Sequence, residues 1–257
     1  EMSASLVGSE MCIRDRMKSE VLKELPPKTE NVYRIELEEE QRKLYLAAVV
    51  DAREKLRAAK PEDKMAVFAV LMRLREICCD PRLIADNWTG GSAKLDACIE
   101  LVTSAVESGH RILLFSQFTS MLELLAKRLD AEGVSHFTLQ GSTPKPVRAE
   151  LVRRFNGGEA SVFLISLRAG GTGLNLTAAD IVIHYDPWWN VAAQNQATDR
   201  AHRIGQEKQV SVFKLIMKDT VEENILLLQE QKRDLADQII SGEQVSIGSL
   251  SREELLK

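Results

Sequence analysis

The sequence lacks any apolar segment long enough to cross a membrane. Its longest uninterrupted apolar run, from Met65 to Met72, has eight residues, whereas a membrane-spanning helix needs about 18–20. No leader with a basic start, an apolar centre and a small-residue cleavage site opens the chain. We therefore expect no membrane span, no membrane partner and no classical secretion.

Cysteine is scarce, and its spacing fits none of the common cysteine-based sites. The four cysteines, Cys12, Cys78, Cys79 and Cys98, form no C-x-x-C pair, so we expect neither a zinc site nor a disulfide framework. This usage indicates an intracellular protein, in the cytoplasm or nucleoid of a bacterium or the nucleus of a eukaryote. The net charge of −4 provides no overall positive field, so any contact with nucleic acid must be local.

The chain also lacks the main parts of a complete nucleotide site. No G-x-x-x-x-G-K-[ST] sequence and no Walker B acidic tetrad occur in its 257 residues. A dinucleotide G-x-G-x-x-G after the first strand and a nucleophile–base pair are missing as well, which disfavours a small-molecule enzyme. A bound nucleotide would need another protein segment for its phosphate cradle and metal ligands.

The residues that are present are sufficient for a large globular domain. Apolar residues make up 44% and charged residues 28% of the chain, both near the globular average. We divide the chain into a non-native or disordered leader (1–16), a helical preface (17–90), an α/β lobe (91–240) and a tail (241–257). In the preface, Pro26 and Pro27 predict an extended entry strap, and apolar periodicity predicts helices over residues 36–60 and 65–77.

The lobe alternates short apolar runs with helical patterns. The runs are residues 112–115, 137–139, 162–165, 181–184 and 210–217, and the helical patterns are residues 119–132, 144–156 and 191–200. Runs that are apolar on both faces, with helices between them, predict a doubly wound parallel sheet in an α/β fold. Functional loops in such a fold follow the carboxyl ends of the strands.

A glycine-rich segment follows one of these strands. Gly170, Gly171 and Gly173 fall within four residues after the strand that ends at Ser166. Glycines let the backbone pass close to a ligand and present its N–H groups, so the segment predicts a phosphate contact. A tight turn that joins strand and helix is an equally good interpretation of the glycine spacing alone.

A second segment, residues 196–206, carries two arginines. Arg200 and Arg203 are three residues apart, so on one helical face both guanidinium groups could reach the same anion. The alternative is a solvated ion-pair surface with Asp199 and Glu207. His202 lacks metal-ligand spacing and is expected to be a hydrogen-bonded structural residue, so we assign no metal.

Taken in order, these segments closely resemble the motifs of the second RecA-like lobe of SWI/SNF-type ATPases, which are superfamily two helicase-like proteins. The matching segments are residues 113–118, 139–143 with Arg148, 154–156, 166–180, 186–190 and 196–206. The sequence DRAHRIGQ at residues 199–206 is the most specific of them. Residues 25–28 and 75–83 resemble the inter-lobe helical region of that family, which assigns residues 17–90 to that region and 91–240 to a RecA-like helicase C-terminal lobe.

Small departures from the family pattern remove no charged catalytic group. Arg168 stands where the family usually has lysine, Val191 where it has proline, Gln140 where many relatives have aspartate, and Asp80 where histidine is frequent. The large departure is that a first lobe, with its Walker A lysine and acidic metal-binding box, is missing. We therefore expect this chain to be the second half of a two-lobed motor.

The resemblance implies an ATP site, with Mg²⁺, between the lobes and held mainly by the first lobe. Arg200 and Arg203 would act there as arginine fingers, the implied catalytic residues, and such a finger can contribute about 10³–10⁵ in rate. The implied ATP contacts also include Gly171, Gly173, Asn175 and Gln196. The implied DNA contacts are Ser116, Gln117, Gly141, Ser142, Thr143, Arg168, Gly170, Thr172 and Trp188.

The resemblance also implies a translocase on double-stranded DNA that remodels protein–DNA complexes through sequence-independent phosphate contacts. Its partners would be the first lobe in cis and DNA-bound proteins such as a polymerase. Because the phosphate cradle is missing, we expect this chain alone to hydrolyse no ATP.

Two other expectations concern binding surfaces and the core. The charge-rich preface, residues 17–85, allows a second function, a protein-interaction module that docks a regulator. Of Trp188 and Trp189, we expect only one to contact DNA, because a tryptophan pair after a strand more often packs inside a domain. Phe118, Phe155 and Phe163 are expected in the core.

Overall fold

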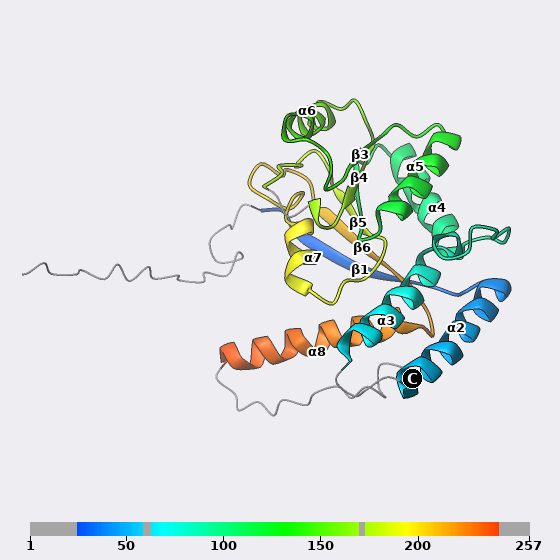
Figure 1. Ribbon diagram of the computed structural model, residues 1–257. Coiled ribbons are helices and arrows are strands. Elements are labelled where there is room, and N and C mark those ends of the chain that lie inside the picture. Colours follow the sequence, from blue (N-terminus) through cyan, green and yellow to red (C-terminus); the bar gives the residue numbers. More distant parts are fainter. Residues whose placement is uncertain (1–24, 59–62, 170–172, 242–257) are drawn as a thin grey trace, which may run out of the picture.

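The computed structural model describes residues 25–58, 63–169 and 173–241. The predicted leader, residues 1–16, and the predicted tail beyond residue 241 lie outside this part of the chain. Six parallel strands form one sheet in the order β1-β6-β5-β2-β4-β3 (Figure 1). The strands are β1 (Lys28–Ile35), β2 (Ile112–Ser116), β3 (His136–Leu139), β4 (Val162–Ser166), β5 (Ile181–His184) and β6 (Val210–Met217).

Helices cover both faces of the sheet, so the predicted doubly wound α/β fold is confirmed. The helices are α2 (Glu39–Ala58), α3 (Lys64–Cys79), α4 (Ala93–Glu107), α5 (Thr119–Ala131), α6 (Lys145–Asn156), α7 (Val191–Thr198) and α8 (Val221–Ser241), with a short 3-10 helix, η1 (Pro81–Leu83). Alternate strand residues enter two cores: Leu114 packs with apolar residues of α4 and α5, and Leu113 with those of α6 and α7. Phe118, Phe155 and Phe163 are buried, as predicted.

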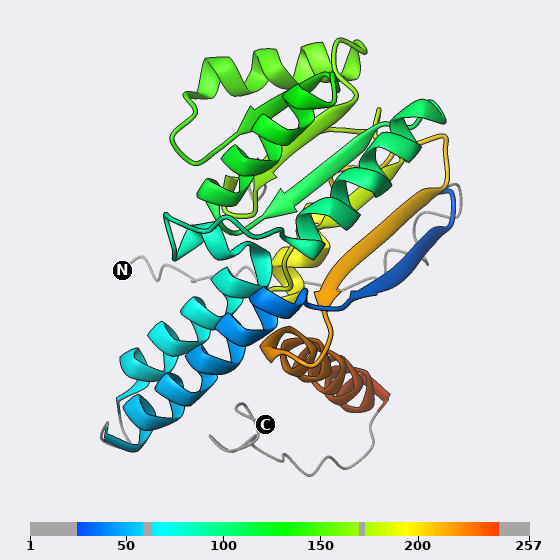
Figure 2. The ribbon, with the colours of Figure 1, turned by 90° about the vertical axis from the view of Figure 1, so that its right-hand side faces the viewer.

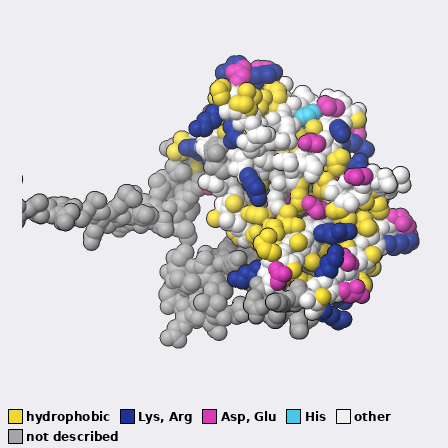
Figure 3. Space-filling model, in the orientation of Figure 1, with side chains coloured by type: hydrophobic (Ala, Val, Ile, Leu, Met, Phe, Trp, Pro, Cys, Tyr) yellow, Lys and Arg dark blue, Asp and Glu magenta, His cyan; other side chains and the backbone are white. Residues whose placement is uncertain are grey.

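The central strands β2, β4 and β5 consist mainly of apolar residues, which favours a place in the middle of the sheet. Every residue of β2, β4 and β5 is buried, because helices remove both faces of a parallel sheet from water. None of the helices in the described part of the chain combines the length and apolar character that a membrane span requires. On the face seen in Figure 3, basic and acidic side chains are interspersed.

Residues 28–35 continue the predicted extended strap into a strand that the sequence did not predict. They form β1, which pairs along its whole length with β6, from Lys28 opposite Val210 to Ile35 opposite Met217. Only Ile35 of this strand is buried. An edge strand exposed to water needs no apolar run, and the segment KTENVYRI contains none.

The rest of the preface is a helical hairpin of α2 and α3 that projects beyond the carboxyl ends of the strands (Figure 2). Its two helices confirm the predicted ones to within a few residues. The side chain of Asp63 caps α3 by accepting a hydrogen bond from the N–H of Ala66 at 3.0 Å. Asp80 ends α3, and Pro81 begins η1.

Candidate nucleotide and DNA interface

The motif segments follow the carboxyl ends of neighbouring strands. Ser116 and Ser166 are register partners at the ends of β2 and β4, and Phe115 pairs with His184 at the end of β5. Because the strands are parallel, the loops that follow these ends lie along one edge of the sheet. The structure therefore brings the loops after β2, β4 and β5 to one edge, as the predicted parallel strands required.

Asp186, just after β5, organises the first loop. Its Oδ1 accepts hydrogen bonds from the Ser116 hydroxyl at 2.6 Å and from the N–H of Gln117 at 3.0 Å. The Ser116 oxygen in turn accepts from the N–H of Phe118 at 3.2 Å. Ser116 is only 1% exposed, so this hydroxyl, expected to contact DNA, holds the loop in the described conformation.

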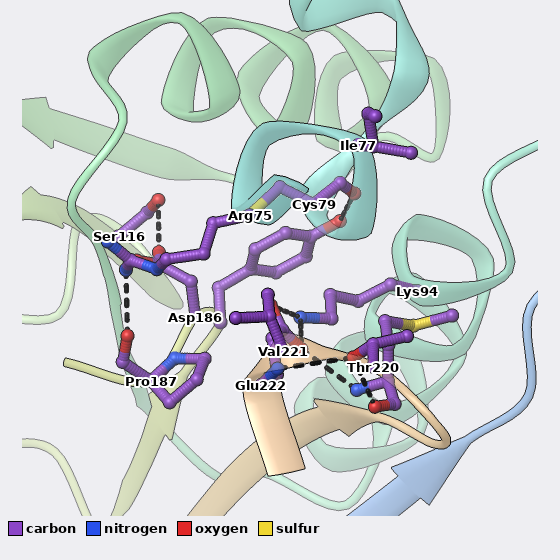
Figure 4. Close-up of polar contacts among 12 residues, drawn as sticks. Arg75, Ile77, Cys79, Lys94, Ser116, Asp186, Pro187, Thr220, Val221 and Glu222 are labelled. Atoms are coloured by element: carbon purple, nitrogen blue, oxygen red, sulfur yellow. Dashed lines mark hydrogen bonds and ion pairs between the residues drawn. The ribbon is translucent and has the colours of Figure 1, made fainter. Parts of the chain in front are cut away.

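Arg75 of α3 reaches into the same network, and sequence reasoning assigned it no role (Figure 4). Its Nη2 donates to Asp186 Oδ2 at 2.9 Å and to the carbonyl of Pro187 at 2.7 Å. Its Nη1 donates to Gln117 Oε1 at 2.9 Å. The resemblance of residues 75–83 to the inter-lobe region includes Arg75, but nothing in the sequence distinguishes it from Arg73 two residues earlier.

The loop after β3 presents backbone to solvent. Gly141 and Ser142 are exposed, whereas Thr143 accepts a hydrogen bond from the N–H of Gln140 at 3.0 Å. Arg148 of α6 donates to the carbonyl of Gly141 at 2.9 Å and to that of Thr143 at 2.8 Å. Arg148 thus holds the loop from the side of α6, while Gly141 and Ser142 remain accessible to solvent.

The glycine-rich segment is only partly described. Gly170, Gly171 and Thr172, predicted to contact DNA or ATP, lie outside the described residues. Arg168, Gly173 and Asn175 are exposed on either side of this gap. Gly173 has φ +39°, in the left-handed region that favours glycine.

The two predicted arginine fingers lie in turns, which corrects the expectation of one helical face. Helix α7 ends at Thr198, and the N–H of Arg200 donates to Ala197 at 3.1 Å in a tighter turn. The carbonyl of Arg200 accepts from the N–H of Leu176 at 3.0 Å, so it is bonded to the segment after β4. Gln196 is exposed on α7.

The charges of Arg200 and Arg203 are nevertheless near enough to influence each other. Burial lowers the pKa of Arg200, and the positive charge of Arg203 lowers it further. Arg200 is 8% exposed, whereas Arg203 is exposed. Two neighbouring permanent cations, one of them desolvated, are suited to an anionic ligand.

Gln206 and His202 fix this arginine-bearing segment. The buried amide of Gln206 donates to the carbonyls of Ala179 at 2.8 Å and Ala201 at 3.1 Å. His202 Nε2 lies 2.8 Å from the carbonyl of Pro26, which agrees with the structural role expected for it. Among the described residues, no group of three or more His, Cys, Asp or Glu side chains is placed to hold a metal ion.

Trp188 and Trp189 are half-buried and pack on each other, with ring centroids 4.8 Å apart. Both rings also pack on the Arg75 guanidinium, at 5.3 Å and 4.9 Å. The structure thus uses both tryptophans in packing, and the DNA contact predicted for Trp188 stays a prediction.

A second buried ion pair lies beside the first (Figure 4). The ammonium of Lys94 is 2.6 Å from both carboxylate oxygens of Glu222, and both side chains are fully buried. Glu222 also accepts from the N–H of Met217 at 2.8 Å. This pair joins the start of α4 to the start of α8, and the Lys94 ammonium lies 5.4 Å from the ring centroid of Tyr185, the residue before Asp186.

Comparisons with known proteins agree with these features. The family model described as SNF2-related domain matches residues 5–83, and the one described as Helicase conserved C-terminal domain matches residues 93–205. The chain is 37% identical over 246 residues to an uncharacterized ATP-dependent helicase, MG018, of Mycoplasma genitalium, covering 94% of this chain and 24% of the relative. It is 37% identical over 258 residues to the SWI/SNF-related matrix-associated actin-dependent regulator of chromatin subfamily A member 1 of Mus musculus, covering 94% and 25%.

Solved structures give the same result. The C-terminal domain of the Sulfolobus solfataricus SWI2/SNF2 ATPase aligns with a TM-score of 0.71 and 29% identity, over 89% of this chain and 96% of that one. The core of a Sulfolobus solfataricus SWI2/SNF2 ATPase in complex with dsDNA aligns with a TM-score of 0.72 and 31% identity, over 88% and 48%. The chain spans about a quarter of the length of the curated relatives that it matches. The chain belongs to the SNF2-related helicase family and has the fold of the C-terminal lobe of a SWI2/SNF2 ATPase.

Proposed function

We propose that this chain is the second motor lobe of an ATP-dependent translocase that moves on double-stranded DNA and remodels protein–DNA complexes. The observation that carries the proposal is the pair Arg200 and Arg203 in one turn segment, the first 8% exposed and the second exposed. Burial and Arg203 lower the pKa of Arg200, and Asp199 opposes that shift. Repulsion between two like charges is relieved when an anion binds beside them, and the carboxylate of Asp199 already acts on Arg200 in this direction. Their place in the DRAHRIGQ segment supports a role as arginine fingers.

The residues around this pair suit a triphosphate. Gly173, Asn175 and Gln196 are exposed on the adjoining segments, and bound ATP would supply the phosphoryl group that is transferred to water. Arg200 and Arg203 would neutralise negative charge on its phosphates, an effect that is greatest where charge develops in the transition state. The described residues offer no cluster for Mg²⁺, so we assign the metal and the main phosphate cradle to a first lobe.

The proposed DNA surface is formed by the loops after the strands. Gly141, Ser142 and Arg168 are exposed there, and backbone N–H groups with a flanking guanidinium suit phosphate oxygens. Such contacts carry no base information, as a translocase requires. We place this motor inside the cell, with DNA-bound proteins such as a polymerase among its partners.

DNA binding by the chain tests this surface. We expect weak binding that is similar on two unrelated duplexes, because the contacts are to phosphate. Affinity should fall steeply between 50 and 200 mM salt through counterion release. Fluorescence anisotropy over a salt series measures both properties, and a strong preference for one duplex or a flat salt response would contradict the assignment.

The projecting hairpin supports a second candidate function, docking of a protein regulator. Leu46 and Val50 on α2 and Met65 and Phe68 on α3 are large apolar side chains exposed to solvent. Replacing Leu46 and Val50 by serine should leave DNA-stimulated ATP hydrolysis of the full-length protein unchanged and abolish its response to a regulator. A matching loss of hydrolysis would instead make this surface part of the motor.

A further inference from the structure

Arg75 connects three segments that are far apart in the sequence. It belongs to α3, and its guanidinium bonds to Gln117 after β2 and to Asp186 and Pro187 after β5. The side chains of Arg75 and Asp186 are both fully buried. A buried guanidinium with three directed hydrogen bonds fixes the relative positions of its partners more strictly than apolar packing does.

Residues of α3 contact both the oxygen and the nitrogen of the Gln117 side-chain amide. Its Oε1 accepts from Arg75 Nη1 at 2.9 Å, and its Nε2 lies 3.4 Å from the sulfur of Met72. Because Arg75 can only donate, it selects the amide orientation in which the oxygen faces α3. The Gln117 side chain is therefore set by the hairpin and not by its own loop.

The Arg75 guanidinium also contacts the loop after β5, residues 186–190, which we call the Trp188 loop. The Pro187 carbonyl accepts from Arg75, and the rings of Trp188 and Trp189 pack on it. Phe68 of α3 makes an edge contact with Trp189, at 5.9 Å between ring centroids. On the other side, the Gln229 amide donates to the Trp188 carbonyl.

We propose that Arg75 is a positioning residue for the DNA surface: it holds Gln117 and the Trp188 loop in the arrangement that binds duplex phosphates. The inference rests on the proposed function and on the DNA contacts that the family resemblance implies for Gln117 and Trp188. If Arg75 links the α2–α3 hairpin to these two loops in this way, a displacement of α3 moves the loops as well and changes the affinity for DNA.

Three variants of the full-length protein test the inference. Arg75→Lys keeps a positive charge beside Asp186 but loses the planar group that bonds Gln117 and Pro187 together. Met72→Leu conserves volume and removes the sulfur that faces the Gln117 amide at 3.4 Å and Arg75 Nη1 at 3.7 Å. Lys94→Met is the matched control, because it breaks the other fully buried ion pair, whose hydrogen bonds join Lys94 to Glu222 and Glu222 to Met217 rather than to Gln117 or Pro187.

We expect Arg75→Lys to raise the Kd for a labelled duplex about tenfold, the effect of losing one charge-assisted hydrogen bond. Turnover at saturating DNA should stay within about twofold of wild type, since the arginine fingers are not altered. Acrylamide quenching of tryptophan fluorescence should increase in Arg75→Lys and not in Lys94→Met. Lys94→Met should lower the melting temperature and keep the wild-type Kd.

The outcomes distinguish a failure of the positioning role of Arg75 from a failure of the proposed DNA-binding function. An unchanged Kd in Arg75→Lys, or equal rises in Arg75→Lys and Lys94→Met, overturns the positioning role. If Arg75→Lys does not fold, Met72→Leu decides, because a wild-type Kd in that variant also overturns it. If the wild-type protein itself binds no duplex, the proposed function fails first.

Discussion

Replacing Arg203 by alanine in the full-length protein distinguishes an arginine finger from a surface arginine. Arg203 is exposed, so its truncation removes little buried surface, and the free energy of unfolding should change by about 0.5 kcal/mol or less. As a finger it stabilises charge that develops in the transition state, so turnover should fall by about 10³–10⁵. This loss corresponds to roughly 4–7 kcal/mol in the activation barrier, far more than the stability change.

The assay is DNA-stimulated ATP turnover and nucleotide affinity on one preparation, with the melting temperature as control. Nucleotide affinity should stay near wild type, because the interaction is strongest in the transition state. Arg203→Lys should restore little, since lysine keeps the charge but not the planar fork. Near wild-type turnover in Arg203→Ala would refute the reasoning and leave the finger role to Arg200 alone.

Two further predictions concern the buried polar residues. Burial lowers the pKa of His184 from 6.5 to about 3, so between these values the unfolded chain binds a proton that the native chain does not. Stability should therefore fall by about 2 kcal/mol between pH 7.5 and pH 5 through His184, and urea unfolding of His184→Asn should show a pH dependence smaller by that amount; equal dependence would contradict the burial argument. Lys94→Met leaves the buried carboxylate of Glu222 without its cation and should cost about 3–5 kcal/mol in urea unfolding, whereas a cost below about 1 kcal/mol, typical of a surface pair, would show that the pair is solvated.

The sequence predicted the centre of the sheet well because burial there is complete. Strands β2, β4 and β5 are apolar on both faces, and such runs have few other interpretations once helical patterns separate them. Strand β1 escaped this reasoning because its pairing with β6 uses backbone groups, which carry no side-chain signature. An edge strand with one buried residue has no apolar pattern to detect.

The candidate site was predicted at the level of loops more than of side-chain roles. Parallel topology alone sends the motif loops to one edge, so their grouping followed from the predicted strands. The prediction that Arg200 and Arg203 share one helical face was wrong. The carbonyl of Arg200 accepts a hydrogen bond from the N–H of Leu176, and the carbonyl of Ala201 accepts one from the Gln206 amide, so neither continues the helix. These partners are distant or irregular in sequence, so periodicity could not show them.

Arg75 illustrates what a single sequence hides. One arginine in an amphipathic helix indicates a solvated side chain by default, and its partners Gln117 and Asp186 lie 42 and 111 residues away. Only the fold brings the three together. A buried charge becomes a candidate for function once the structure places its partners in the motif loops.

The central claim is that this chain completes an ATPase whose phosphate cradle lies on another lobe. Steady-state phosphate release with duplex DNA, measured on the purified 257-residue chain and on the full-length protein, tests it most directly. We predict DNA-stimulated hydrolysis by the full-length protein and none above background by the chain alone, because no Walker A sequence occurs in it. Robust turnover by the chain alone would contradict the claim.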